Sequence, residues 1–264
     1  MTHANSIRYH ESVIRSALFV LALSLCLRAE TSLANNGQPM HIPFECTEDD
    51  MLATGITCSE QDPCPVYLEL SSVEAVGDRL FLTGNLHTPT NTLYSILLAS
   101  EDAGQNWTEP LARMRASGLD QIQFVDFQTG WISGANLQGA PRDPFLLLTS
   151  DGGKTWRQHT LFEESRVASI ERFWFDSREN GTLLVDATLD NGKHELYETK
   201  TGGESWELRQ AGESPIRFPK TDRGPAAWRL HPDAATHSYA VEKSQGSGWH
   251  RVASFLVNVG ACKQ

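Results

Sequence analysis

The sequence has little positive charge. Its 264 residues include 22 Lys and Arg against 33 Asp and Glu, which gives a formal net charge of −11. Nucleic acids and anionic membranes bind proteins through clusters of basic side chains. We therefore expect no nucleic-acid partner and no electrostatic attachment to lipid. The acidic excess is typical of a well-solvated protein surface.

The sequence also lacks an apolar run long enough to span a membrane. The run Ser16–Leu27 has roughly a dozen residues, whereas a membrane-spanning helix needs about 20. Arg8 and Arg15 precede it, and a small-residue triplet ending at Ala34 follows. This pattern is that of a secretory signal peptide, here residues 1–34. We expect an exported protein, periplasmic or extracellular, with no stable membrane span after cleavage; retention of the leader as an anchor is the alternative.

Cysteine is scarce, and four of the five cysteines follow the predicted leader: Cys46, Cys58, Cys64 and Cys262. An even number of cysteines in an exported chain favours disulfides. Three of them lie in the N-terminal segment 35–64, and the fourth lies two residues before the C-terminus. We expect at least one bridge between the two ends, with three connectivities open. A zinc site is less favoured, because no His stands near the cluster at a usual ligand spacing.

Familiar catalytic motifs are missing too. The sequence contains no G-x-S-x-G, no H-E-x-x-H and no phosphate-binding loop. His231, His237 and His250 fall in one stretch, but ordinary surface positions explain them better than a metal site does. We therefore predict a protein that is not an enzyme, with no catalytic residues, no cofactor and no metal.

What the chain does contain is a repeated octapeptide that ends in Trp. The four copies are SEDAGQNW (100–107), TSDGGKTW (149–156), TKTGGESW (199–206) and EKSQGSGW (242–249). A Gly stands three residues before each Trp, and the copies recur every 43 to 50 residues. Self-similarity at this period indicates a repeat architecture.

Each copy follows a short apolar or alternating run, such as LYSILLA or PFLLL, and further short runs precede it, separated by turn dipeptides. This pattern predicts three or four short antiparallel strands in each unit. The units extend over about 65–112, 113–161, 162–210 and 211–258. Together they form one repeat domain, 65–264, behind the Cys-containing segment 35–64.

The octapeptide has a physical interpretation as a β-hairpin turn. Asp102 and Asp151 can accept hydrogen bonds from backbone N–H groups across the turn, and Gly104 and Gly153 tolerate a positive φ. The Trp then packs over the turn from the returning strand. Other residues replace the Asp in the third and fourth copies, so we expect the fourth hairpin to be the loosest.

This pattern resembles the Asp-box, or BNR repeat, S/T-x-D-x-G-x-T/S-W. The stretch FVDFQTGWISG (124–134) with the copy that follows it resembles a unit of the photosystem II stability/assembly factor-like family. The resemblance implies an all-β β-propeller of about four blades, with five blades or an open β-sandwich as alternatives. The structural Asp-box positions are Ser100, Asp102, Gly104, Trp107, Thr149, Asp151, Gly153, Thr155, Trp156, Thr199, Gly203, Ser205, Trp206, Gly246 and Trp249.

The same resemblance implies an exported, non-enzymatic scaffold or assembly factor that binds a protein partner. The alternative is a glycan-binding or sialidase-like glycan-active propeller, because sialidases carry Asp-boxes; a purely structural envelope module stays open as well. The arginine motif of sialidases is absent, and the neighbours Tyr197 and Glu198 should point to opposite faces of a strand. Trp174 and Arg217 are the candidate binding residues.

Overall fold

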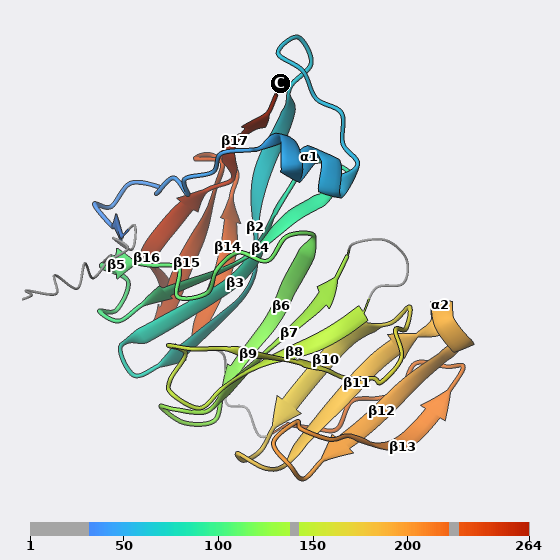
Figure 1. Cartoon of the computed structure of the whole chain (residues 1–264). Coiled ribbons are helices and arrows are strands. Elements are labelled where there is room, and N and C mark those ends of the chain that lie inside the picture. Colours follow the sequence, from blue (N-terminus) through green and yellow to red (C-terminus); the bar gives the residue numbers. More distant parts are fainter. Residues whose placement is uncertain (1–31, 138–142, 222–226, 264) are drawn as a thin grey trace, which may run out of the picture.

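The computed structural model describes residues 32–137, 143–221 and 227–263, and these form four main antiparallel sheets. The prediction of an all-β, propeller-like fold is confirmed (Figure 1). Helix is confined in these residues to two short segments, α1 (Glu48–Thr54) and α2 (Thr188–Asn191). None of the helices in the described part of the chain has the length and apolar character needed to cross a membrane.

Each sheet is built mainly from consecutive strands. Sheet 1 has the order β17 (Asn258–Cys262), β2 (Cys64–Val76), β3 (Arg79–His87), β4 (Thr92–Ser100). Sheet 2 contains β6 (Ser117–Phe124), β7 (Gly130–Asn136), β8 (Asp143–Thr149) and β9 (Arg157–Thr160). Sheet 3 contains β10 (Ser169–Phe175), β11 (Gly181–Ala187), β12 (Lys193–Thr199) and β13 (Glu207–Gly212). Sheet 4 contains β14 (Trp228–Asp233), β15 (Ser238–Gln245) and β16 (Gly248–Leu256), and a small pair joins β1 (Leu33–Ala34) to β5 (Asn106–Trp107).

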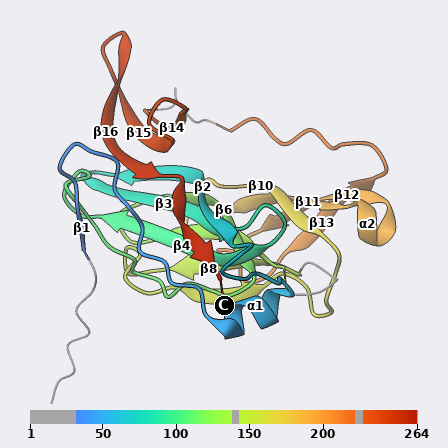
Figure 2. The ribbon, with the colours of Figure 1, turned by 90° about the horizontal axis from the view of Figure 1, so that it is seen from above.

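The sheets pack face to face through three apolar layers, because a single sheet cannot bury its own faces. Phe255 of sheet 4 lies in one core with Leu82 of sheet 1, and Phe81 of sheet 1 lies in the next with Ile132 of sheet 2. A third core joins sheets 2 and 3 around Trp131, which is 1% exposed. The spatial order is therefore 4-1-2-3, and sheets 3 and 4 lie at the two ends of the row (Figures 1 and 2).

Polar side chains connect the inner strands of successive sheets. The Gln123 side chain on β6 accepts a hydrogen bond from Phe175 N at 2.9 Å and donates one to Phe175 O at 2.8 Å. Glu74 on β2 accepts from Phe124 N at 3.3 Å in the preceding junction. These contacts give partners to the backbone at strand edges that face the next sheet rather than another strand.

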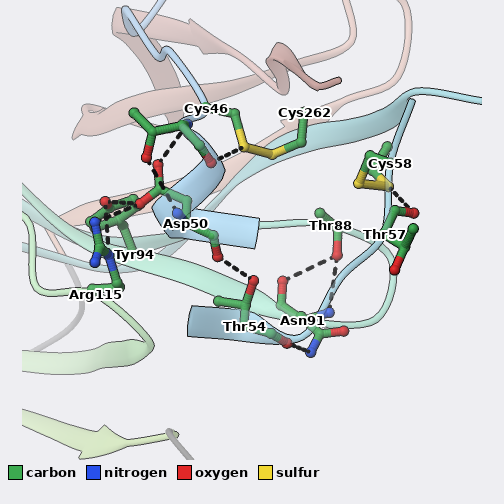
Figure 3. Close-up of a disulfide and its surroundings, with 12 residues drawn as sticks. Cys46, Asp50, Thr54, Thr57, Cys58, Thr88, Asn91, Tyr94, Arg115 and Cys262 are labelled. Carbon is green, nitrogen blue, oxygen red and sulfur yellow. Dashed lines mark hydrogen bonds and ion pairs between the residues drawn. A yellow bond between two sulfur atoms is a disulfide. The ribbon is translucent and has the colours of Figure 1, made fainter. Parts of the chain in front are cut away.

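The two ends of the described chain are joined covalently (Figure 3). Cys46 is bonded to Cys262, and Cys58 to Cys64. The predicted disulfides, including the bridge between the ends, are confirmed. Cys262 also pairs with Cys64 in the β17–β2 register, so the C-terminal strand is held both by sheet hydrogen bonds and by the disulfide.

The segment between the two disulfides is anchored on sheet 1. Thr47 and Asp50 form a capping box at the start of α1. The carboxylate of Asp50, which is 1% exposed, accepts a hydrogen bond from Tyr94 on β4 and pairs with Arg115 at 2.9 Å (Figure 3). These contacts of the buried Asp50 with Tyr94 and the exposed Arg115 hold α1 over the end of sheet 1.

Candidate functional site

The first two predicted Asp-box turns share one geometry. Asp151 Oδ1 accepts hydrogen bonds from Lys154 N at 3.1 Å and Thr155 N at 3.0 Å, and Oδ2 accepts from Thr155 Oγ1 at 2.6 Å. These bonds, with that of the Thr155 side chain first, lower the pKa of Asp151 to about 2. Gly153 has φ +85° and Trp156 Nε1 donates to its carbonyl at 3.0 Å. Asp102, Gly104 and Trp107 repeat this arrangement in sheet 1.

The third and fourth copies depart from this geometry. Thr201 accepts a single backbone bond from Ser205 N at 2.9 Å in place of the Asp, and Trp206 Nε1 is buried without a hydrogen-bond partner. In the fourth copy β15 and β16 meet through the pair Gln245↔Gly248, which leaves a two-residue turn containing Gly246. Trp249 is 36% exposed, and the guanidinium carbon of Arg229 lies 4.4 Å from the centroid of its ring. The fourth copy therefore closes an ordinary two-residue hairpin.

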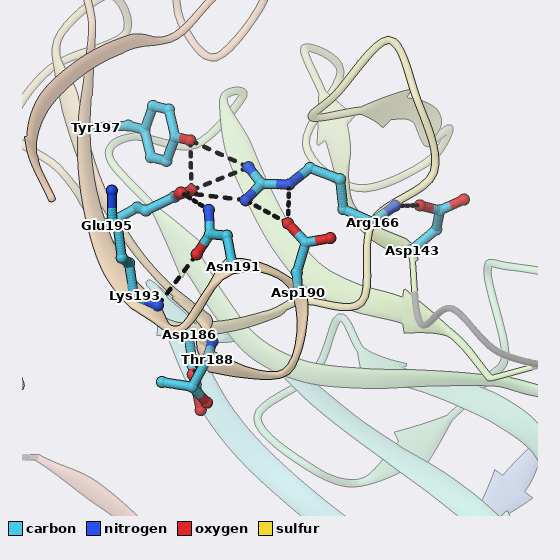
Figure 4. Close-up of polar contacts among 9 residues, drawn as sticks. All are labelled: Asp143, Arg166, Asp186, Thr188, Asp190, Asn191, Lys193, Glu195 and Tyr197. Atoms are coloured by element: carbon cyan, nitrogen blue, oxygen red, sulfur yellow. Dashed lines mark hydrogen bonds and ion pairs between the residues drawn. The ribbon is translucent and has the colours of Figure 1, made fainter. Parts of the chain in front are cut away.

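A larger polar cluster surrounds Arg166, at the end of sheet 3 opposite its predicted Asp-box turn (Figure 4). Arg166 donates to Glu195 at 2.9 and 3.1 Å and to Asp190 at 2.9 Å. Tyr197 donates to Glu195 at 2.6 Å, and Asn191 donates to the same carboxylate. Sequence reasoning considered Glu198 as the partner of Tyr197 and missed Glu195, two residues away on the same face of β12.

This cluster has the parts of a tyrosine–glutamate pair but not the electrostatics of a nucleophile. Burial and the hydrogen bond to Glu195 raise the pKa of Tyr197 to about 12, which keeps the phenol neutral. The Arg166 guanidinium is already occupied by two carboxylates, so it is not free to bind an anionic substrate. The arrangement is that of a structural ion-pair cluster, which connects Asp143 of sheet 2 with Glu195 of sheet 3 through Arg166.

A second acidic pair lies on the inner strands of sheets 1 and 2. Along β2, Leu68 and Leu70 are buried in the core, whereas Tyr67 and Glu69 alternate with them and face the accessible side. Asp120 lies in a β-bulge of β6, between Leu119 and Ile122. β-Bulges commonly re-aim side chains next to active sites.

The two carboxylates are coupled electrostatically. The side chain of Asp120 reaches solvent, but the packed sheets around it partly desolvate the carboxyl. This desolvation raises its pKa, and the charge of Glu69 raises it further. The backbone carbonyl of Asp120 accepts a hydrogen bond from Thr83 Oγ1 at 2.6 Å, which fixes the bulge against β3. A pair in which one carboxyl has a raised pKa suits general acid–base chemistry.

A cavity of about 540 Å³ lies between sheets 4 and 1, and its lining residue Tyr67 stands two residues before Glu69 on β2. Its lining includes Tyr67, Tyr239 and Asn258, with the β14–β15 hairpin from Pro232 to Ser238. Burial and the nearby charge of Glu69 both raise the pKa of Tyr239, which relates the cavity to the acidic pair. A cavity of this volume with aromatic walls has the dimensions of a small-ligand site. It lies at the end of the sheets opposite the predicted Asp-box turns.

The two candidate binding residues lie elsewhere. Trp174 is half-buried on β10 and donates from Nε1 to Asp176 at 2.9 Å, and Arg217 is exposed in the segment after β13. Neither lines the cavity. Among the described residues, Glu171, Asp186 and His194 bring one potential metal-ligand atom each within 4.8 Å of the others. His194 and Glu171 pair at 3.1 Å, and we assign this group no ligand.

The fold and the site thus define a propeller-like protein of antiparallel sheets with an acidic, tyrosine-lined cavity. No protein-family model matches the sequence. A curated relative from Emericella nidulans, an oligoxyloglucan-reducing end-specific xyloglucanase, is 29% identical over 134 residues. The match covers 49% of this chain and 16% of the relative, so the chain spans only a small part of that enzyme.

Solved structures with similar arrangements have low sequence identity. They include YCF48 bound to a D1 peptide (17% identity, TM-score 0.39, 71% of this chain and 54% of that chain). An ulvan lyase is similar at 12% identity and TM-score 0.39, covering 77% of this chain and 54% of that chain. An α-L-arabinofuranosidase from Fusarium graminearum is similar at 14% identity and TM-score 0.38, covering 73% and 59%. At these identities the likeness concerns the fold alone.

These matches correct one prediction and support another. The prediction that the chain is not an enzyme is wrong, because the curated relative is a xyloglucanase, which is a hydrolytic enzyme. The two disulfides are typical of an exported protein, as predicted. The sequence-based alternative of a glycan-active propeller is therefore better supported than the scaffold function.

Proposed function

We propose that this protein hydrolyses glycosidic bonds, with Asp120 as general acid and Glu69 as its partner carboxylate. The observation that carries the proposal is that Glu69 acts on two groups: its charge helps to raise the pKa of Asp120, and it also raises the pKa of Tyr239 in the wall of the cavity. Most glycosidases use two carboxylates that flank the scissile bond, one protonated and one ionised. The match to a xyloglucanase makes xyloglucan oligosaccharides the first substrates to test.

In the proposed reaction, the carboxyl of Asp120 gives its proton to the glycosidic oxygen as the C–O bond to the anomeric carbon breaks. The ionised carboxylate of Glu69 stabilises the positive charge that develops on the sugar ring and takes a proton from the attacking water. The water oxygen forms the new bond to the anomeric carbon. Tyr67 and Tyr239 supply flat apolar faces for the sugar rings on either side.

The test measures release of reducing ends from a panel of neutral plant-wall oligosaccharides, including xyloglucan fragments, by the full chain purified after export. We expect hydrolysis of at least one member, and Asp120→Asn and Glu69→Gln should each reduce kcat by about 10²–10⁴-fold. Glu101→Gln is the matched control, because Glu101 is an exposed carboxylate at the opposite end of sheet 1. Absence of hydrolysis across the panel, or full activity in Asp120→Asn, would refute the assignment.

A further inference from the structure

The charges around the cavity restrict the kind of sugar that it can accept. We infer that the cavity binds neutral sugar units and discriminates against sugars that carry a carboxylate, such as uronic and sialic acids. This inference rests on the proposed function, in that it takes the ligand to be a glycan. It deepens that proposal by naming the substrate class.

The tyrosines provide a surface suited to an uncharged ring. Tyr67 contacts the ring of His87 at 6.0 Å between centroids, and its backbone pairs with His87 in the β2–β3 register. Tyr239 is half-buried, and its raised pKa keeps the hydroxyl neutral, able both to donate to and to accept from a sugar hydroxyl. Asn258 and His237 add exposed polar groups at the cavity edge.

The lining residues that the structure describes offer no Lys or Arg to an acidic sugar. These are Tyr67, Pro232, Asp233, Ala234, His237, Ser238, Tyr239, Val257 and Asn258, none of them Lys or Arg. Proteins that bind a sugar carboxylate need a charge-assisted partner, most often Arg in a bidentate pair.

The arginines of sheet 4 that the structure describes near this hairpin are already engaged. Arg251 binds Asp233 at 2.6 Å, and this contact first of all lowers the pKa of Asp233 to about 2. Arg229 binds Glu242 at 2.7 Å and lies over Trp249.

The ionised carboxylate of Asp233 is neutralised by its ion pair with Arg251. The negative charge that acts on the cavity wall is that of Glu69, which raises the pKa of Tyr239. A carboxylate on the ligand would therefore meet the charge of Glu69, with no Lys or Arg among the described lining residues to compensate it, and like-charge contacts suppress the wrong ligand. A neutral sugar meets no such repulsion. The selectivity follows from the lack of a Lys or Arg among the described lining residues together with the negative charge of Glu69.

The experiment compares two ligands that differ only in charge. One is a neutral xyloglucan oligosaccharide, and the other is the same oligosaccharide with one primary alcohol oxidised to a uronic acid. Binding of each to the Asp120→Asn chain is measured by titration calorimetry, so that hydrolysis does not interfere. We expect the oxidised ligand to bind at least tenfold more weakly, and Tyr67→Ala or Tyr239→Ala to weaken binding of the neutral ligand at least tenfold.

A charge-reversal variant makes the test specific to the cavity. Ala234→Lys places a cation at the exposed edge of the lining and should bring the two affinities within about threefold of each other. Ala211→Lys, at an exposed position on β13 of sheet 3, changes the net charge equally and should leave the discrimination intact. Circular dichroism of each variant establishes that the fold is retained.

The outcomes separate this inference from the proposed catalysis. Equal or tighter binding of the oxidised ligand overturns the inference, and so does the absence of binding of either ligand. If the neutral ligand binds selectively but the native chain hydrolyses nothing, the selectivity stands and the catalytic proposal fails. If the native chain cleaves neutral and oxidised substrates with equal kcat/KM, the catalytic proposal stands and the inference fails.

Discussion

Removal of the Cys46–Cys262 disulfide should destabilise the protein far more than removal of Cys58–Cys64. A cross-link lowers the entropy of the unfolded chain in proportion to the logarithm of the loop that it closes. The two loops span 216 and six residues. The chain-entropy relation then gives about 5 kcal/mol for the first bridge and about 2 kcal/mol for the second.

The structure gives a reason to expect most of this difference to be realised. Cys262 is the last residue of β17, the strand that lies at the edge of sheet 1 beside β2. Sheet 4 packs on the same sheet through Phe255, so the disulfide acts where the last sheet of the chain meets the first. Because domain stabilities are typically about 5–15 kcal/mol, loss of the long-range bridge should leave only marginal stability.

The assay is equilibrium urea unfolding, without reductant, of the double variants Cys46→Ser/Cys262→Ser and Cys58→Ser/Cys64→Ser, followed by Trp fluorescence. The expected difference in free energy of unfolding between them is about 3 kcal/mol. Hydrogen exchange should show earlier loss of protection in β17 in the first variant. Equal destabilisation of the two variants, or a larger loss in the second, would refute the reasoning from loop entropy.

Three further perturbations test the site and its supports. Activity should fall as the pH rises through the raised pKa of Asp120, because deprotonation removes the general acid. If the residual activity of Asp120→Asn falls at high pH in the same way as that of the native chain, Asp120 is not the group that titrates. Arg166→Ala should cost about 3–5 kcal/mol of stability, since it leaves the buried Glu195 without its cation, whereas Arg178→Ala, which removes an exposed pair with Asp126, should cost about 1 kcal/mol or less. Burial raises the pKa of Glu195, but hydrogen bonds from Arg166, Tyr197 and Asn191 outweigh this effect and lower the pKa overall. The stability that the Arg166–Glu195 ion pair contributes should therefore be present at neutral pH and be lost as the pH falls through that lowered pKa. Thermal melts that show no such loss of stability in acid would contradict this. Thr201→Asp should stabilise sheet 3 by about 1 kcal/mol, because the carboxylate can accept the bonds that Asp151 accepts in sheet 2; an unchanged or lower melting temperature would show that the turn has other constraints.

Features that depend on nearby residues could be predicted from the sequence. The Trp-containing octapeptide specified a hairpin turn because Asp, Gly and Trp act within a few residues of one another. Alternating runs such as PVYLEL predicted strands, and the same alternation places Tyr67 and Glu69 on one face of β2. The even count of cysteines after residue 34 predicted disulfides, although it left their connectivity open.

Tertiary structure decided everything that depends on residues far apart in the chain. The Cys46–Cys262 pairing and the position of sheet 4 beside sheet 1 depend on which sheets pack together, and repeat spacing does not encode this. The bulge that holds Asp120 is a shift of register between two strands, which is decided by pairing rather than by local pattern. The cavity brings Tyr67 and Tyr239 together from opposite ends of the chain. The sequence by itself therefore determined the strands and turns, because their energetics are local, whereas the site exists only after packing brings distant carboxylates and tyrosines together and changes their solvation.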